Sequence, residues 1–203
     1  MAETKHKKRG SALTLGFLLV VLIAVTAYLI ISLPATEAEA AEGSVAALVQ
    51  DQPDDVAKTT LIHAGDVAPD FTVEMLDGSK VTLSELQGKP TLLIFWATWC
   101  PPCRQEMAHL QEGVIDHFAG KNLVVLPISR GEKRDVVEKF LADNGYTFGV
   151  GLDPERAIYD LYASNFVPRT FIINKRGKVV YRVAGYDEET AKAVNAAIAK
   201  ALR

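Results

Sequence analysis

The only two cysteines in the chain, Cys100 and Cys103, lie three positions apart in the stretch FWATWCPPCRQE, residues 95–106. Two thiols at this spacing can form half of a metal site, a small structural disulfide or a redox-active pair. Each use makes a different demand on the rest of the sequence, so the other residues decide between them.

The metal and structural uses find little support elsewhere in the sequence. A structural zinc site needs four ligands, usually two Cys pairs or Cys together with His, and the chain has no second Cys pair. His63, His109 and His117 show no ligand spacing with the cysteines, and His6 precedes a predicted membrane segment. A disulfide across so short a loop removes little chain entropy and stabilises a fold only weakly. Redox chemistry is therefore the favoured use.

The position of the pair between a predicted strand and a predicted helix also favours redox chemistry. TLLIFW at 91–96 is an apolar run of strand length, and residues 101–118 carry apolar side chains at helical spacing. Cys100 then lies at the start of a helix, where free amides and the helix dipole favour a thiolate. We expect Cys100 to be the exposed attacking thiolate and Cys103, one turn later, the shielded resolving thiol.

Three further residues within the same stretch are candidates for this site. Pro101 and Pro102 fit a first helical turn because they have no N–H to leave unsatisfied. Glu106 follows Cys103 by three residues and so shares its helix face. A carboxylate at the edge of the core would have a raised pKa and could handle the proton of Cys103. The alternative is a solvated helix glutamate.

A proline far along the chain is the other candidate. Pro168 precedes a predicted strand at 170–173, where it marks either an edge strand or the end of a loop. If its peptide bond is cis, the turn would bring the backbone of Val167 beside the cysteines to hold an extended partner chain.

These residues must be positioned by one predicted α/β domain over residues 65–203. Apolar runs at 91–96 and 123–128 predict two strands that are buried on both faces. Strands alternate with helices and end in a hairpin and a closing helix, which is typical of an α/β sandwich with a mixed central sheet. The other expected elements are extended segments at 68–73 and 81–83, a short helix capped by Ser84, helices at 132–144, 154–162 and 188–202, and strands at 148–152, 170–173 and 179–183.

The N-terminal part of the chain has a different character. Leu13–Leu33 carries no charge, and a helix of this length reaches about 31 Å, roughly the thickness of bilayer hydrocarbon. The basic residues within 1–12 predict a cytoplasmic N-terminus and a catalytic domain outside the membrane. A cleaved signal peptide is the alternative, since Ala38–Ala40 resembles a cleavage site. Residues 34–64 carry six acidic side chains and one basic one, which predicts a flexible acidic linker.

Two longer stretches carry a family resemblance. APDFTVEMLDGSKVTLSELQGKPTLLIFWATWCPPCRQEM at 68–107 and VPRTFIINKRGKVV at 167–180 resemble the thioredoxin superfamily. They are most similar to its membrane-anchored TlpA/ResA group of thiol–disulfide oxidoreductases. The resemblance covers about residues 65–203. It implies a thioredoxin fold with an N-terminal extension and a βα insertion near 130–152, preceded by one transmembrane helix.

The resemblance also implies roles for single residues. Cys100 and Cys103 would be the redox pair, Pro168 the cis-proline, and Glu106 the acid found in related cytochrome c maturation thioredoxins. Ile94 stands where ordinary thioredoxins carry Asp, which gives Glu106 more weight in proton transfer. Arg169 stands where some maturation members carry Glu, so their substrate preference does not transfer directly. The expected partner contacts are Trp99, Pro101, Pro102, Val167 and Pro168.

These features predict an extracytoplasmic, single-pass, membrane-tethered enzyme that reduces disulfides in exported proteins, with apocytochrome c as one expected substrate. No cofactor and no metal are expected, and an integral-membrane electron donor would re-reduce the pair. The net charge of -3 gives no footprint for nucleic acid. One rival is a thiol peroxidase, although Thr98 and Arg104 lie within the redox motif rather than in a peroxidatic arrangement. The other is a module that handles copper through its thiols.

Overall fold

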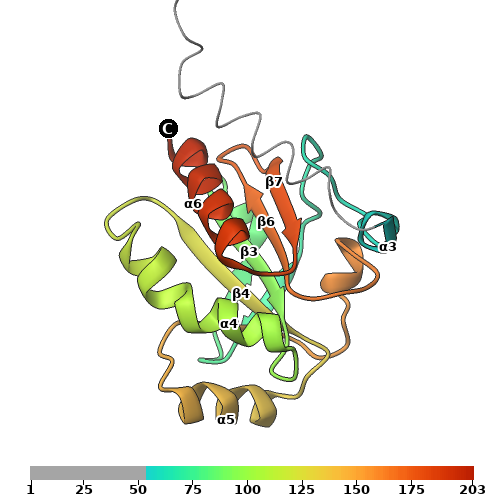
Figure 1. The fold of residues 1–203 in the computed structure, drawn as a ribbon, viewed down its shortest axis with the longest axis vertical. Helices are drawn as coiled ribbons and strands as arrows, with labels where there is room; N and C mark the ends of the chain where they lie inside the picture. Colours follow the sequence, from blue (N-terminus) through green and yellow to red (C-terminus); the bar gives the residue numbers. More distant parts are fainter. Residues whose placement is uncertain (1–53) are drawn as a thin grey trace, which may run out of the picture. The chain divides into compact units, whose positions relative to one another are not determined.

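One mixed sheet organises the part of the chain that the structure describes. The structure is a computed structural model, and it describes residues 54–203 (Figure 1). Seven strands lie in the order β2-β1-β5-β4-β3-β6-β7. The strands are β1 (Thr72–Met75), β2 (Lys80–Thr82), β3 (Thr91–Trp96), β4 (Val124–Arg130), β5 (Gly151–Asp153), β6 (Arg169–Ile173) and β7 (Val179–Ala184). The helices are α3 (Asp54–Lys58), η1 (Leu83–Leu86), α4 (Pro101–Leu110), η2 (Gln111–Asp116), α5 (Arg134–Asn144), η3 (Tyr159–Leu161) and α6 (Glu188–Leu202).

The predicted membrane segment at 13–33 and the first part of the predicted linker lie outside the described residues. Within residues 54–203, no helix combines the length and the apolar character that crossing a bilayer requires.

The centre of the sheet is built by the strands that the sequence marks as most apolar. All six residues of β3 are buried, as expected for a strand with packing on both faces. β3 pairs in parallel with β4 and antiparallel with β6. β4 pairs in parallel with β5, so the carboxyl ends of β3, β4 and β5 share one edge of the sheet. That edge is where the chain leaves β3 toward the cysteines.

Alternating residues of β3 feed two separate apolar cores, because successive side chains in a strand point to opposite faces. Leu92, Ile94 and Trp96 join a core that includes both cysteines and buried residues of α4, α5 and α6. Leu93 and Phe95 join a core that includes Tyr159 and Tyr162, together with residues from the N-terminal extension. Figure 1 shows α4 and α6 in front of the central strands.

Two of the predicted helices were wrong in part. The helix expected over 101–118 is α-helical only as far as Leu110 and continues as the π-helical turn η2. Gly113 lies in that turn, and glycine weakens an α-helix. The helix expected over 154–162 is a series of turns that ends in η3. Arg156 has a left-handed backbone there, with φ 62°, which an α-helix cannot contain.

Other boundaries also differ from the predictions. Ser84 does not cap η1: the cap position is Thr82, whose side chain makes no capping hydrogen bond, and the amide of Ser84 donates to Asp70. On α5, Val136 is exposed whereas its neighbour Val137 is fully buried. The strand expected at 148–152 is β5, which starts at Gly151.

The domain starts earlier than expected, because residues 54–64 pack on it instead of continuing the linker. Thr60 is buried and forms a bridge with Ala163. The amide of Leu61 donates to the carbonyl of Tyr162 at 3.0 Å. The predicted boundary at Gly65 was therefore wrong, since the composition of this segment did not reveal its backbone pairing.

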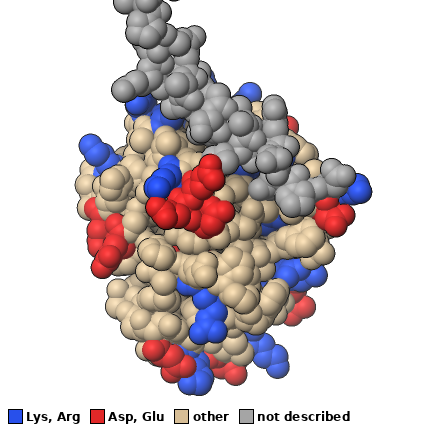
Figure 2. Space-filling view, in the orientation of Figure 1, with Lys and Arg blue, Asp and Glu red and all other residues tan. Residues whose placement is uncertain are grey.

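Charged side chains of both signs are interspersed on the face of the molecule in Figure 2. Most of that face is uncharged, and the blue Lys and Arg side chains lie in separate groups among the red acidic ones.

Candidate active site

The two cysteines form a disulfide at the point where the chain passes from β3 into α4. Cys100 is the N-cap of α4 and has an extended backbone, while prolines occupy the first positions of the helix. The amide of Cys103 points at Cys100 Sγ at 3.4 Å. A free helix-start amide in this position stabilises negative charge on that sulfur after reduction.

The two sulfurs differ less in exposure than the sequence predicts. Cys103 is fully buried, as expected for a resolving thiol, but Cys100 is only 3% exposed. The expectation of an exposed Cys100 was therefore wrong for this oxidised form. Its sulfur is bonded to Cys103 and lies 3.3 Å from the carbonyl oxygen of Val167.

Pro168 comes to this site through the pairing of β3 with β6. The two strands are antiparallel, with Phe95 opposite Arg169, so the residues before β6 lie beside the residues after β3. The Val167–Pro168 peptide bond is cis, which confirms that prediction. The Val167 carbonyl faces Cys100 Sγ, so a reduced Cys100 thiol has an acceptor within reach.

Glu106 is a buried carboxyl group on the same helix. It is 6% exposed, its Oε1 accepts a hydrogen bond of 2.9 Å from Thr170, and its Oε2 has no partner within residues 54–203. Burial raises the pKa of Glu106 to about 8, although the Thr170 hydrogen bond acts in the opposite direction. The direction of this pKa shift agrees with the sequence prediction, and the burial of the side chain excludes a solvated helix glutamate.

Ile94 and Glu106 line the same small cavity, which has a volume of about 40 Å³. Thr170, the hydrogen-bond donor to Glu106, pairs directly with Ile94 across the two strands. The carboxyl group of Glu106 therefore lies next to the position where ordinary thioredoxins carry Asp, although it comes from a helix instead of a strand.

The remaining predicted contact residues differ in exposure. Trp99 is 62% exposed and Pro101 is also exposed, whereas Pro102 is half-buried and Pro168 is buried. The sequence analysis did not single out Phe166, which is 40% exposed next to Val167. Its backbone is left-handed, with φ 68°, and a bulky residue rarely adopts that conformation. Large exposed apolar side chains thus lie on both segments that meet at the disulfide.

A buried glutamate that the sequence analysis missed holds the loop before Cys100. Glu132 accepts hydrogen bonds from the amide of Thr98 at 2.9 Å, from the Thr98 hydroxyl, and from Ser129 at 2.8 Å. It follows β4, whose residue Ser129 is in register with Trp96. The sequence did offer a signal for this contact. Glu132 lies just after the predicted strand parallel to β3, and the carboxyl ends of parallel strands meet at one edge of a sheet.

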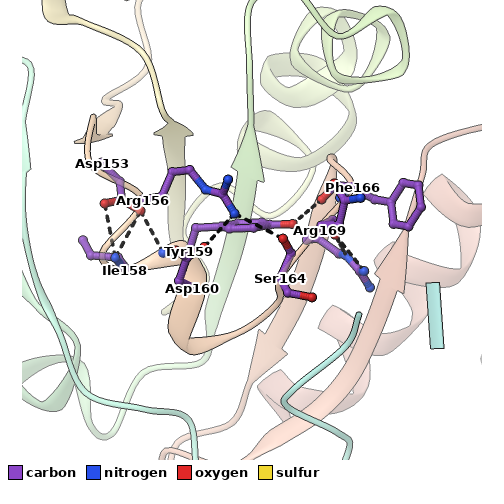
Figure 3. A network of polar contacts seen from close by, with 9 residues as sticks. Asp153, Arg156, Ile158, Tyr159, Asp160, Ser164, Phe166 and Arg169 are labelled. Atoms are coloured by element: carbon purple, nitrogen blue, oxygen red, sulfur yellow. Dashed lines mark hydrogen bonds and ion pairs between the residues drawn. The ribbon is translucent and has the colours of Figure 1, made fainter. Parts of the chain in front are cut away.

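Arg169, the residue after the cis-proline, makes internal contacts. Its guanidinium, 1% exposed, donates to Thr60 Oγ1 at 2.6 Å, Thr59 Oγ1 at 2.7 Å and the Asn165 carbonyl at 2.9 Å. Burial away from any carboxylate lowers its pKa. Figure 3 shows Arg169 beside Phe166. Arg169 thus joins the segment that contains Thr59 and Thr60 to the loop that contains the cis-proline.

No group of three or more His, Cys, Asp and Glu side chains suited to a metal ion occurs within residues 54–203. A mixed sheet, a disulfide at a strand-to-helix junction and a cis-proline facing it define the thioredoxin-like class of thiol–disulfide oxidoreductases.

Comparisons with known proteins agree with this class. The model of the AhpC/TSA family matches residues 64–182, and the chain belongs to this family. Thiol-disulfide oxidoreductase ResA of Bacillus subtilis is 37% identical over 124 residues, which cover 61% of this chain and 69% of that protein. ResA of Oceanobacillus iheyensis is 34% identical over 145 residues, which cover 70% of this chain and 73% of that protein.

Solved structures give the same result. A crystal structure assigned as a thiol:disulfide interchange protein DsbE from Chlorobium tepidum has a TM-score of 0.65 and 32% identity, covering 70% of this chain and 99% of that one. StoA from Bacillus subtilis has a TM-score of 0.54 at 24% identity, covering 63% of this chain and 98% of that one, and supports the fold alone. The chain is a thiol–disulfide oxidoreductase of the ResA and DsbE type.

Proposed function

We propose that the chain is an extracytoplasmic, membrane-tethered enzyme that reduces disulfides in exported partner proteins. The observation that carries this proposal is the Cys100–Cys103 disulfide beside the Val167 carbonyl. That carbonyl belongs to a backbone segment that can pair with an extended partner chain. The apolar segment at 13–33 supports the tether, and the direction of electron flow rests on the resemblance to the TlpA/ResA group.

The reaction has two exchange steps. The Cys100 thiolate attacks one sulfur of the partner disulfide, forming a mixed disulfide and releasing the other partner sulfur as a thiolate. Cys103 then loses its proton and attacks Cys100 Sγ, so the second partner sulfur also leaves. The partner gains two electrons, and the Cys100–Cys103 pair is oxidised to the disulfide that the structure contains.

Glu106 is the proposed group that accepts the proton of Cys103. The two residues are one helical turn apart, and burial raises the pKa of Glu106 to about 8. A carboxyl group with a pKa near the working pH can both take and return a proton. Its Oε2, which lacks a hydrogen bond within the described residues, is free for that role.

The expected substrates are exported proteins with a cysteine pair that must be kept reduced, and apocytochrome c is one example. Trp99, Pro101, Pro102, Val167 and Pro168 are the proposed partner contacts. A membrane protein of the electron-donor type would return two electrons to Cys100–Cys103 after each turnover.

A trapping experiment tests the proposal. The Cys103→Ser variant of the full chain keeps the attacking sulfur and loses the resolving one, so it should accumulate mixed disulfides with its partners in cells. Cys100→Ser is the matched control and should trap nothing. Adducts are detected on non-reducing gels and identified by mass spectrometry.

Recovery of monomer alone from Cys103→Ser, or equal adducts from both variants, would contradict the proposal. Peroxide consumption by the reduced chain at a rate rivalling disulfide exchange would favour a peroxidase instead. Stoichiometric, tight copper binding by the reduced chain would favour the copper-handling alternative.

A further inference from the structure

Three arginines surround one buried tyrosine at the edge of the sheet that carries the active site. Tyr159 is fully buried. The guanidinium carbon of Arg130 lies 4.5 Å from the ring centroid of Tyr159, and that of Arg156 lies 5.6 Å from it. Arg169 is close enough to influence the same ring electrostatically. The Tyr159 hydroxyl donates to the carbonyl of Phe166, in the loop that leads to the cis-proline (Figure 3).

The carboxylates around this cluster are committed elsewhere. Asp153 is buried and accepts bonds from the amides of Ile158 and Tyr159. Glu132 is occupied by Thr98 and Ser129.

Asp160 pairs with Arg156 at 2.8 Å and is the one acid that pairs with any of the three arginines within residues 54–203. The exposed Glu155 forms no ion pair with them. The cluster therefore keeps an excess of positive charge.

Arg130 and Arg169 share that excess, and Arg169 already has oxygen acceptors. Within residues 54–203 the guanidinium of Arg130 makes no hydrogen bond, and its only recorded contact is the Tyr159 ring. Its Nε is buried without a partner, whereas the side chain as a whole is only half-buried. A partly desolvated guanidinium is unfavourable unless a hydrogen-bond acceptor pairs with it. A carboxylate matches its planar fork of donors.

The backbone around the cluster is also held in an unusual shape. Arg156 has φ 62°, a left-handed backbone that is unfavourable for a non-glycine residue. A side chain at Gly131, which has φ 74°, would approach the Arg156 side chain at 3.5 Å. A strained backbone conformation persists only where the surrounding contacts hold it, so the position of the Arg156 side chain is fixed by its surroundings.

Two chain connections link the cluster to the edge of the sheet where the disulfide lies, although Tyr159 packs in the core on the other face from the cysteines. Arg130 directly follows Ser129, which is in register with Trp96 and is bonded to the glutamate that holds Thr98. Phe166, which Tyr159 holds, directly precedes Val167. A partner segment that leaves Val167 and Cys100 along this edge of the sheet would reach Arg130 at the end of β4.

We propose that Arg130 and Arg156, which both contact the Tyr159 ring, form an anion subsite. The subsite would bind an acidic side chain of the partner protein, close to the partner cysteine that pairs with Cys100. The inference rests on the proposed reduction of partner disulfides and adds a preference for acidic sequence next to the reactive cysteine.

Two cyclic peptide disulfides test this subsite. They are identical except that residues flanking the cysteines are Asp in one and Asn in the other, and both are reduced by the reduced full chain. At low salt, the Asp peptide should have a kcat/KM about two- to fivefold higher than the Asn peptide, as for a partly exposed ion pair. High salt should remove the difference, because exposed charges are screened.

Variants assign the preference to Arg130. Arg130→Gln should abolish the preference and leave the rate on the Asn peptide unchanged, whereas Arg130→Lys keeps the charge and should retain part of it. Lys121→Gln makes the same charge change just before the other end of β4 and should leave the preference intact.

Each outcome has a distinct meaning. Equal rates on both peptides, or an equal loss with Lys121→Gln and Arg130→Gln, would overturn the subsite while leaving the proposed function standing. Reduction of neither peptide by the unaltered chain would instead contradict the proposed function.

Discussion

Arg169 and Thr170 are neighbours in β6, and their side chains lie on opposite faces of the sheet. One is a buried ionisable group, and the other is hydrogen-bonded to one. Thr170 donates to Glu106, whose second oxygen has no partner within residues 54–203. Arg169 is itself the charged group, and hydroxyl and carbonyl oxygens surround its guanidinium. Both residues follow the cis-proline directly.

The difference separates a reactive group from a structural one. A carboxyl group with one hydrogen bond and a raised pKa can change its protonation state at working pH. A guanidinium whose burial lowers its pKa still stays protonated, because an arginine pKa begins far above neutrality. We therefore expect Glu106 to act through its proton and Arg169 through its contacts, and substitutions should separate the two roles.

The largest effect on stability at one fixed pH is expected from Arg169→Met. This change removes the donors to Thr59, Thr60 and Asn165, of which Thr60 is buried and Thr59 half-buried. The free energy of unfolding in urea should fall by about 3 kcal/mol. Arg176→Met, in the exposed hairpin turn, is the control and should change it by less than about 0.5 kcal/mol. A loss below about 1 kcal/mol for Arg169→Met would refute its structural role.

The next largest effect is expected in the pH dependence of stability. Glu106 has a folded pKa of about 8 against an ordinary value of 4.5, so the folded chain holds an extra proton between these pH values. Its contribution to stability is complete below about pH 4.5 and falls as pH rises to about 8, by at most about 1.4 kcal/mol per pH unit.

Glu106→Gln should remove this slope, and urea unfolding at a series of pH values measures it. Glu112→Gln, an exposed glutamate in η2, should leave the slope unchanged. An unaltered slope in Glu106→Gln would mean that the carboxyl group ionises as freely as in the unfolded chain.

The smallest effect is expected from Thr170→Val. The Thr170 hydrogen bond lowers the pKa of Glu106 against the effect of burial, so its loss should move that pKa further upward. Titration of carboxyl-labelled glutamate by NMR measures the shift. Thr190→Val, whose hydroxyl bonds only within the cap of α6, is the matched control. A downward shift in Thr170→Val would show that the hydroxyl does not stabilise the carboxylate.

The sequence predicted the parts of the site that rest on local pattern. The apolar run of β3, the helix after it and the cysteines at their junction are read from neighbouring residues. The raised pKa of Glu106 was predicted because the adjacent Met107 marks the buried face of the helix. The sequence analysis made the approach of Val167 to the cysteines depend on a cis bond before Pro168, and that bond is cis.

The parts that the sequence did not predict depend on distant partners. Arg169 bonds to Thr60, which is 109 positions away, and no local pattern indicates that contact. The turns after Pro154 replaced a predicted helix because the Asp153 carboxylate takes the amides of Ile158 and Tyr159. Side-chain competition of this kind overrides helical periodicity.

The proposal that the enzyme donates electrons is tested most directly by the reduction potential of the Cys100–Cys103 pair. The full chain is equilibrated with thiol–disulfide buffers, and its thiols are counted by alkylation and mass spectrometry. We predict a potential near that of thioredoxin, about -270 mV. A value near about -120 mV, as for a strong oxidant, would contradict it and make the chain a source of disulfides.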